Sequence, residues 1–333
     1  MKVLYIGGTG EISYECVRRG VEMGHETSVF NRGRNRHAAA LPPEVRQIRG
    51  DLSDDAAYRA LADERFDVVC QFLAFRTETV ARDIDVFSGT CGQYVFISSA
   101  SAYRKPPADY IVTEDTPLAN PYWPYSRAKI EMERVLLDAH AAGTLPVTVV
   151  RPSHTHRTRF PGGIAGGDDW AWRMLKGRPI LVHGDGTSLW TLTHSADFAV
   201  PFCKLLGRAE TLGECYHITR HLRGFTWNDI YAAMAEAAGA EPDIVHVPCD
   251  TLVRYNADWA GPLLGDKCWP VIFDNSKVMS VAGEFACRSL EAAMRAAAED
   301  YAAHRRDAYD PDAKRELHAL IDRIASEQRA LGR

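Results

Sequence analysis

The chain has 333 residues, 46% of them hydrophobic, which is enough to bury a sizeable core in two domains or one two-lobed unit. Its net charge of −5 argues against nucleic acid as a partner, because nucleic acid attracts basic surfaces. The eight scattered cysteines form no C-x-x-C pair, and we expect neither a signal peptide nor a membrane span, so the composition predicts a cytoplasmic protein with reduced thiols.

The first part of the chain alternates between apolar runs and helix-compatible stretches. The apolar runs are nearly continuous, which is typical of strands buried on both faces of a sheet. Strands are predicted at 2–6, 27–30, 45–48, 67–72, 93–97 and 147–150. Helices are predicted from Ile12 onward, at 76–89 and at 126–142. This alternation predicts an α/β fold with a doubly wound parallel sheet between two layers of helices.

The pattern changes after Arg151-Pro152. Residues 153–169 are rich in Gly, His, Arg and Pro, which predicts a loop. Helices are predicted at 168–176, 195–206 and 226–238, short strands at 180–182, 189–193 and 216–218, and an Ala-rich helix at the C-terminus. We therefore expect a first domain over 1–152 and a smaller C-terminal α/β lobe over 153–333. Some segments of that lobe, such as 189–220, should pack back on the first domain.

A glycine-rich loop joins the first strand to the first helix, with the sequence Gly7-Gly8-Thr9-Gly10-Glu11-Ile12. Glycine allows a tight turn and a close approach of the backbone to a pyrophosphate, and the helix N-terminus offers unpaired N–H groups to the anion. Ser13 stands where the usual pattern has its third glycine. The loop predicts a dinucleotide cofactor.

The end of the second strand favours NADP over NAD. It reads Asn31-Arg32-Gly33-Arg34, without the carboxylate that usually holds the ribose hydroxyls in NAD binders. Arg32 and Arg34 are suited to pair with a 2′-phosphate, although Glu11 in the glycine loop counts against an extra phosphate. The alternative is that these arginines form a solvated basic turn.

Asp51-Leu52 follows the third predicted strand. Asp51 has two possible roles, which do not exclude each other. Its carboxylate is placed to accept a hydrogen bond from the adenine amino group, or to act as the N-cap of a helix over 56–61.

Tyr125 and Lys129 are four residues apart at the start of a predicted helix, so both side chains lie on one face. An ammonium near a phenol favours the phenolate and brings the tyrosine pKa towards working pH, as a general base requires. Ser98-Ser99 ends the fifth strand, at the edge where α/β sheets bind ligands. Ser99 is therefore expected to bond the substrate oxygen beside Tyr125.

These motifs follow one another in an order that resembles the extended short-chain dehydrogenase/reductase family, in its NAD-dependent epimerase/dehydratase branch. The resemblance implies a Rossmann domain with a smaller substrate lobe. It implies that Tyr125 is the general acid/base, that Ser99 is a hydrogen-bond donor to substrate, and that Lys129 binds the nicotinamide ribose. It also implies that Asp197 is the N-cap of a lobe helix. Further cofactor contacts are expected at Phe72, Leu73, Ala74, Ser98, Tyr125, Lys129 and Pro152.

Two departures from the family pattern bear on the substrate. Trp190 stands where sugar-nucleotide members carry an arginine for the substrate phosphate, and an indole stacks on a sugar or base instead. Ala100-Ser101 stands where the sugar-nucleotide dehydratases carry an Asp-Glu pair, so elimination by that route is disfavoured.

Cationic and switchable groups gather just past the sixth strand, at Arg151, His154, His156, Arg157 and Arg159. They predict an anion subsite; the alternative is a solvated loop, with Arg151-Pro152 in a structural role. We expect no metal site. The substrate residues suggested by these patterns are Phe75, Ser101, Tyr103, His154, Arg157 and Trp190.

The leading prediction is an NAD(P)-dependent epimerase or oxidoreductase that acts on a secondary alcohol or ketone of a sugar-like, possibly nucleotide-linked, substrate. One alternative is a ketoreductase on a small metabolite without a nucleotide. Another, from a different class, is a non-catalytic NADP-sensing or RNA-associated protein. Neither nucleic acid nor a membrane is expected as a partner, and a homodimer is left open.

Overall fold

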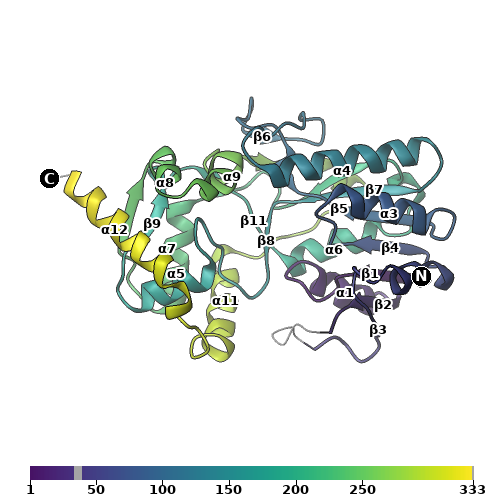
Figure 1. The fold of residues 1–333 in the computed structure, drawn as a ribbon, viewed down its shortest axis with the longest axis horizontal. Coiled ribbons are helices and arrows are strands. Elements are labelled where there is room, and N and C mark those ends of the chain that lie inside the picture. The colour runs from purple at the N-terminus through teal and green to yellow at the C-terminus, as the bar shows by residue number, and fades with distance from the viewer. Residues whose placement is uncertain (34–39, 332–333) are drawn as a thin grey trace.

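The computed structural model describes residues 1–33 and 40–331. Two lobes lie side by side along the long axis of the molecule, with the N-terminus in the larger lobe and the C-terminus at the far end of the smaller one (Figure 1). In the described ranges, no helix is both long enough and apolar enough to cross a bilayer.

The larger lobe is built on a seven-stranded sheet in the order β12-β7-β5-β4-β1-β2-β3, in which all neighbours pair in parallel. Each strand predicted in the first 150 residues is confirmed, with ends that differ by no more than two residues. The strands are β1 (Lys2–Ile6), β2 (Glu26–Asn31), β3 (Arg46–Arg49), β4 (Val68–Gln71), β5 (Gln93–Ile97), β7 (Val147–Pro152) and β12 (Cys215–Ile218).

Helices cover both faces of this sheet, as predicted. Alternate residues of a strand point to opposite faces, so Val3 and Tyr5 of β1 pack in one core cluster while Leu4 and Ile6 pack in the other. The first cluster lies under α1 (Ser13–Glu22), α6 (Ser195–Leu205) and α10 (Ser276–Ala282). The second lies under α2 (Asp55–Arg59), α3 (Thr77–Phe87) and α4 (Pro124–Ala141).

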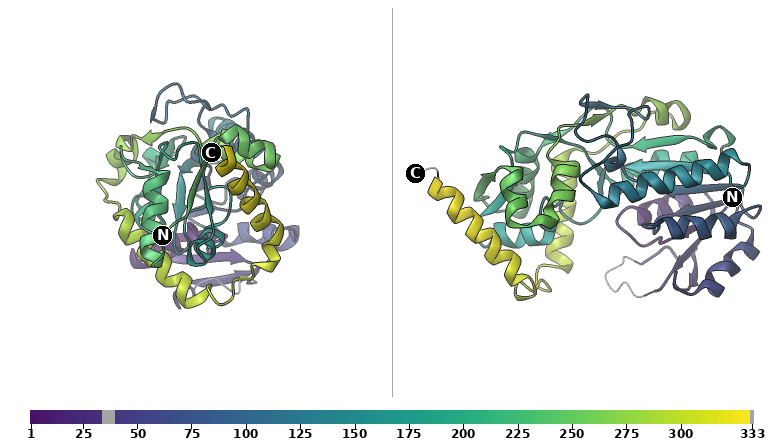
Figure 2. Two further views of the ribbon diagram at one scale, coloured as in Figure 1. Left: turned by 90° about the vertical axis from the view of Figure 1, so that its left-hand side faces the viewer. Right: turned by 45° about the horizontal axis from the view of Figure 1, so that its top comes forward.

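The smaller lobe has its own core around Trp170, Trp227 and Tyr231, which are all fully buried. Its helices surround a two-stranded parallel sheet of β9 (Ile180–His183) and β14 (Ile244–Val247). Figure 2 shows α12 as a long helix on the outside of this lobe. The helices are α5 (Gly167–Leu175), α7 (Trp227–Ala238), α8 (Cys249–Tyr255), α11 (Leu290–His304) and α12 (Arg315–Leu331).

Short elements join the two lobes. The predicted strand at 189–193 is wrong as a single element, because it is divided into β10 (Leu189–Trp190) and β11 (Leu192–His194). β10 pairs with β13 (Phe225–Thr226), while β11 pairs with β8 (His154–His156) inside the segment predicted as a loop. β6 (Ile111–Val112) pairs with β15 (Ile272–Phe273), and α9 (Ala260–Pro262) leads into a π-helical turn over Leu263–Lys267.

The C-terminal stretch is two helices rather than one. α11 ends at His304 and α12 begins at Arg315, with Pro311 between them. Proline disfavours helical geometry in the residue before it and clashes with a preceding helical turn, which explains the break.

Two predicted helix caps are wrong. α6 is capped by His194, whose Nδ1 accepts from the Ala196 amide at 3.1 Å, because the strand already ends there. Asp197 instead pairs with the Arg288 guanidinium at 3.0 Å. The N-cap of α2 is Asp54. The Asp51 carboxylate accepts from the Ser53 amide at 3.0 Å, one turn too early to cap the helix.

Candidate functional site

The glycine loop lies at the carboxyl ends of the central strands, in close contact with Val29 and Leu73 of the adjacent segments. Gly7 has a φ of +88°, and a Cβ there would lie 2.4 Å from Leu73 Cγ. A Cβ on Gly8 would lie 2.6 Å from the Val29 side chain. Ser13 fixes the loop from inside, since its buried hydroxyl donates to the Gly7 carbonyl at 2.6 Å and accepts from the Gly10 amide at 2.9 Å. Only glycine fits this cradle, which suits the close approach of a dinucleotide pyrophosphate.

Residues 157–159, which we name the strap, lie against the glycine loop. The Glu11 carboxylate accepts from the backbone amides of Arg157 at 3.1 Å and Thr158 at 3.4 Å. The Arg157 guanidinium lies 4.4 Å from the centre of the Tyr14 ring. Glu11 therefore joins the cofactor side of the larger lobe to the chain that leads into the smaller one.

The adenosine end of the expected cofactor site carries basic groups at the ends of β2 and β3. The Asn31 side chain accepts from the Gly33 amide at 2.8 Å and closes a turn that leaves Arg32 exposed. Arg49, paired with Asn31 in the sheet register, brings its side chain beside Gly33. Arg49 was not among the predicted site residues, although it directly follows the strand predicted at 45–48. Arg34, predicted to pair with a 2′-phosphate, lies outside the described residues.

The segment after β4 borders both the glycine loop and Lys129. The Leu73 side chain faces Gly7, and the Phe72 ring packs against Tyr5 with centroids 6.3 Å apart. The Lys129 ammonium donates to the carbonyls of Ala74 and Ile97, both at 2.8 Å. These contacts hold the lysine between the ends of β4 and β5.

Tyr125 and Ser99 meet beside this lysine. Burial raises the pKa of Tyr125, a hydrogen bond with Ser99 lowers it, and the carboxylate of Asp266 raises it. The Lys129 ammonium lies 5.8 Å from the centre of the Tyr125 ring, and burial lowers the pKa of Lys129 to about 7. Burial therefore outweighs the hydrogen bond with Ser99 in setting the pKa of Tyr125.

Two residues predicted to touch substrate lie behind the site instead. The Ser101 hydroxyl is 3% exposed, sits 2.9 Å from the Ser99 hydroxyl and accepts from Ser126 at 2.7 Å. Tyr103 is fully buried, with its hydroxyl 3.0 Å from His217 Nδ1. The turn after β5 folds inward after Ser99, so both side chains point into the protein interior, which argues against a direct contact with substrate. Phe75, by contrast, is 54% exposed and lies 5.0 Å from the Lys129 ammonium.

The predicted anion subsite past the sixth strand is not formed. Arg151 is buried and paired with Glu133, with Nη2 and Oε2 2.6 Å apart. Burial lowers the pKa of His154 and that of His156, the latter to about 4, so both rings are neutral near pH 7. Arg157 stacks on Tyr14 at the cofactor side. The cationic groups are thus dispersed into separate structural contacts.

Trp190 has no free face for a sugar, which corrects the prediction that it stacks on substrate. It is 2% exposed, and its ring stacks on Trp227 with centroids 5.4 Å apart. The Lys267 ammonium lies over the Trp190 ring at 5.6 Å. The indole N–H donates to His154 Nδ1 at 3.1 Å, so these two residues support each other beneath the site.

Residues from distant segments complete the substrate side of the site. Asn120 donates from Nδ2 to the carbonyls of Ser101 at 2.8 Å and Gly265 at 2.7 Å. This amide ties the turn after Ser99 to the π-helical turn that carries Asp266 and Lys267. These residues were not predicted, because no recognisable spacing along the sequence relates them to Tyr125.

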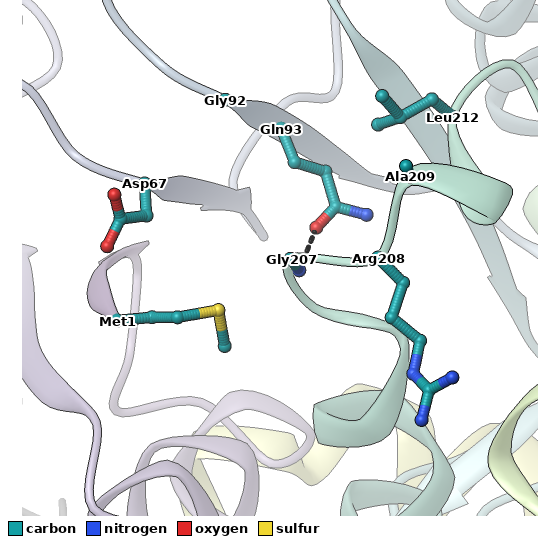
Figure 3. A pocket seen from close by; sticks show the side chains of 8 residues that line it. All are labelled: Met1, Asp67, Gly92, Gln93, Gly207, Arg208, Ala209 and Leu212. Atoms are coloured by element: carbon teal, nitrogen blue, oxygen red, sulfur yellow. Dashed lines mark hydrogen bonds between the residues drawn. The ribbon is translucent and has the colours of Figure 1, made fainter.

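A separate pocket of about 420 Å³ lies at the amino ends of the strands, on the side of the sheet away from the glycine loop (Figure 3). It is lined by residues such as Met1, Asp67 and Gly92 at the amino ends of strands. There the Gln93 side chain accepts from the Gly207 amide at 2.7 Å. Ligands of α/β sheets bind at the carboxyl ends of the strands, so this pocket is not the candidate site.

Known proteins are similar to this chain in sequence and in fold. The chain is 28% identical to 2′-dehydrokanamycin reductase of Streptomyces kanamyceticus over 285 residues, which are 82% of this chain and 77% of that protein. It is 29% identical to chloroplast stem-loop binding protein of 41 kDa b of Arabidopsis thaliana over 259 residues, 74% of this chain and 65% of that protein.

The solved UDP-glucose 4-epimerase of Bifidobacterium longum, in complex with NAD+ and UDP, shares the fold at a TM-score of 0.72 and 18% identity, over 91% of this chain and 99% of that chain. A profile of the NAD dependent epimerase/dehydratase family matches residues 3–218, well over half of the chain. The protein therefore belongs to the NAD-dependent epimerase/dehydratase family, as an enzyme of the extended short-chain dehydrogenase/reductase type that uses a nicotinamide dinucleotide.

Proposed function

We propose that this enzyme interconverts a secondary alcohol and a ketone on a sugar-like substrate, with Tyr125 as the general acid/base. The observation that carries the proposal is the meeting of Ser99, Tyr125 and Lys129 at the carboxyl ends of β4 and β5, next to the glycine loop. A bound nicotinamide would accept or supply the hydride at the reacting carbon.

Each of the three side chains has its own role in the proposed reaction. Tyr125 takes the hydroxyl proton during oxidation and returns it during reduction. The Ser99 hydroxyl bonds the same substrate oxygen and holds it against the tyrosine. Lys129, whose ammonium donates to two carbonyls here, is placed to bind the ribose of the cofactor and to favour the phenolate by its charge.

Two outcomes of this chemistry are possible for the ketone. If it is reduced again on its other face, the enzyme is an epimerase; if it is released, the enzyme is a dehydrogenase or reductase. Trp190 in place of a phosphate-binding arginine favours the second outcome on a substrate without a nucleotide, and the likeness to an enzyme named as a reductase agrees with it. The likeness to a stem-loop binding protein keeps the non-catalytic alternative under test, although the net charge of −5 opposes it.

Native mass spectrometry of protein purified without added cofactor separates these outcomes. We expect an empty enzyme that takes up NADPH reversibly and oxidises it when a sugar-like ketone is added. A tightly retained cofactor that never exchanges would favour epimerisation. Binding of neither NADPH nor NADH would contradict the proposal altogether.

We further propose that NADP is the preferred cofactor, with Arg32 and Arg49 at its 2′-phosphate. Arg49→Ala should weaken NADPH binding roughly tenfold or more and leave NADH binding nearly unchanged, because a charge-assisted hydrogen bond contributes about 1.5–3 kcal/mol. Titration of protein fluorescence measures both affinities. The matched control is Arg46→Ala in the same strand, where Arg46 pairs with Glu64 at 2.7 Å. Equal losses for the two cofactors would refute the assignment.

The strap is proposed to cover the pyrophosphate and slow cofactor exchange. Glu11→Ala removes the acceptor of two strap amides, so NADPH should dissociate roughly tenfold faster in stopped-flow displacement. Glu22→Ala is the control, since Glu22 pairs with Arg18 and Arg19 at the far end of α1. An unchanged dissociation rate in Glu11→Ala would mean that the strap does not limit release.

A further inference from the structure

The π-helical turn over Leu263–Lys267 is packed against the start of α4, the helix that carries Tyr125 and Lys129 and that we name the catalytic helix. Asn120 bonds the Gly265 carbonyl at 2.7 Å, and a Cβ on Gly265 would lie 2.8 Å from Trp123 Cβ. The Trp123 ring in turn lies 4.9 Å from the Tyr125 ring. The turn is therefore packed against the segment that carries the tyrosine, and π-helical turns of this kind are frequent at functional sites.

Two charged side chains on this turn face the site together with a third from the loop after Ser99. The Asp266 carboxylate is near enough to Tyr125 to raise its pKa, and it interacts with both Lys105 and Lys267. Lys105 is only 3% exposed, and the Lys267 ammonium lies over the buried Trp190 ring. The Asp266 carboxylate thus lies near Tyr125 and near both ammonium groups.

These charges are not satisfied by one another. In the described part of the chain, no hydrogen bond or ion pair within 4.0 Å is formed by the Lys105 ammonium, the Asp266 carboxylate or the Lys267 ammonium. Burial accordingly lowers the pKa of both lysines and raises that of Asp266. Lys105 is buried, whereas Asp266 and Lys267 are half-buried. A buried charge is normally paired, because an unpaired one loses its hydration without compensation. A ligand that supplies the partner missing at Lys105 accounts for this position, and the Asp266 carboxylate lies near it.

We infer that Lys105, Asp266 and Lys267 form a recognition cluster for a polyhydroxylated substrate that carries one anionic group, a carboxylate or a phosphate. This inference rests on the proposed function, because it places the ligand against Tyr125. The carboxylate accepts from ligand hydroxyls, and the two ammonium groups donate to the anionic group and to neighbouring oxygens. The two lysines and one aspartate leave one net positive charge, so a ligand that carries an ammonium group is repelled.

Equilibrium binding of simple probes tests the cluster without requiring turnover. The wild-type enzyme, saturated with NADP+, is titrated with glucuronate, glucose 6-phosphate, glucose and glucosamine. We expect one of the two anionic probes to bind at least tenfold more tightly than glucose, with glucosamine the weakest. The comparison of glucuronate with glucose 6-phosphate decides between carboxylate and phosphate.

The same titration of variants assigns the preference to these residues. Lys105→Gln and Lys267→Gln should each reduce the preference for the anionic probe about tenfold, and Asp266→Asn should increase it. Lys277→Gln is the control, because Lys277 pairs with Glu214 on the outside of the larger lobe. Thermal melts and NADPH affinities that match the wild type show that the variants are folded.

Particular outcomes would overturn the inference. Glucosamine binding as tightly as glucuronate, no measurable binding of any probe, or variants that keep the wild-type order would each contradict the cluster. Tyr125→Phe should keep the charge preference. If turnover survives in Tyr125→Phe while the preference is intact, the acid/base assignment fails and the recognition cluster stands. If turnover depends on Tyr125 while the preference is absent, only the cluster fails.

Discussion

Tyr125→Phe should lower kcat about 10²–10⁴-fold while the affinity for NADPH stays close to that of the wild type. The Tyr125 phenol is an ionisable hydroxyl beside Ser99, and phenylalanine keeps the ring packing against Trp123 without offering a proton. Hydride transfer to a ketone leaves an alkoxide unless a proton arrives, so loss of the hydroxyl raises the barrier directly. Steady-state rates with saturating NADPH and the ketone that gives the highest turnover measure the effect.

Tyr122→Phe is the matched control for this variant. Tyr122 lies just before α4, three residues before Tyr125, but it is 37% exposed and has no place in the proposed chemistry. Its removal should leave kcat within about twofold, as is usual for exposed positions without a specific contact. A kcat in Tyr125→Phe that equals that of Tyr122→Phe would overturn the acid/base assignment.

Glu133→Gln should destabilise the fold by about 3–5 kcal/mol, because it leaves the Arg151 charge buried without its counter-charge. Arg151 is 4% exposed, and its Nε and Nη2 both donate to the Glu133 carboxylate. The pair joins the catalytic helix to the end of β7, so its loss should also loosen the support behind Lys129. Urea denaturation followed by circular dichroism gives the change in unfolding free energy.

Glu131→Gln provides the comparison on the same helix. Glu131 pairs with Arg134 at 2.6 Å, but both side chains are exposed and the pair is screened by water, so little change is expected. The distinction between a buried and an exposed ion pair is the basis of this prediction. If the two variants unfold at the same urea concentration, the buried pair contributes no more than a surface one.

The repeating parts of the fold follow from local sequence. Buried strands such as β1 and β5 are continuous apolar runs, and α4 begins where its proline suits a first turn, so their places are readable without neighbours. Elements of two or three residues, such as β8 and β10, carry too little periodicity to be read. They exist because distant segments pair with them.

The sequence by itself determined the parallel sheet and the glycine loop, and it indicated Ser99, Tyr125 and Lys129 as the candidate site, because their order along the chain and the i, i+4 spacing are local properties. Only the tertiary structure decided which charged side chains lie near that candidate site. Arg151 was predicted for an anion subsite, but it forms a buried ion pair with Glu133. Asp266 and Lys267 belong to a turn with no sequence motif, and Asn120 binds that turn near Tyr125. Burial and pairing are properties of three-dimensional neighbours, and spacing along a chain does not encode them.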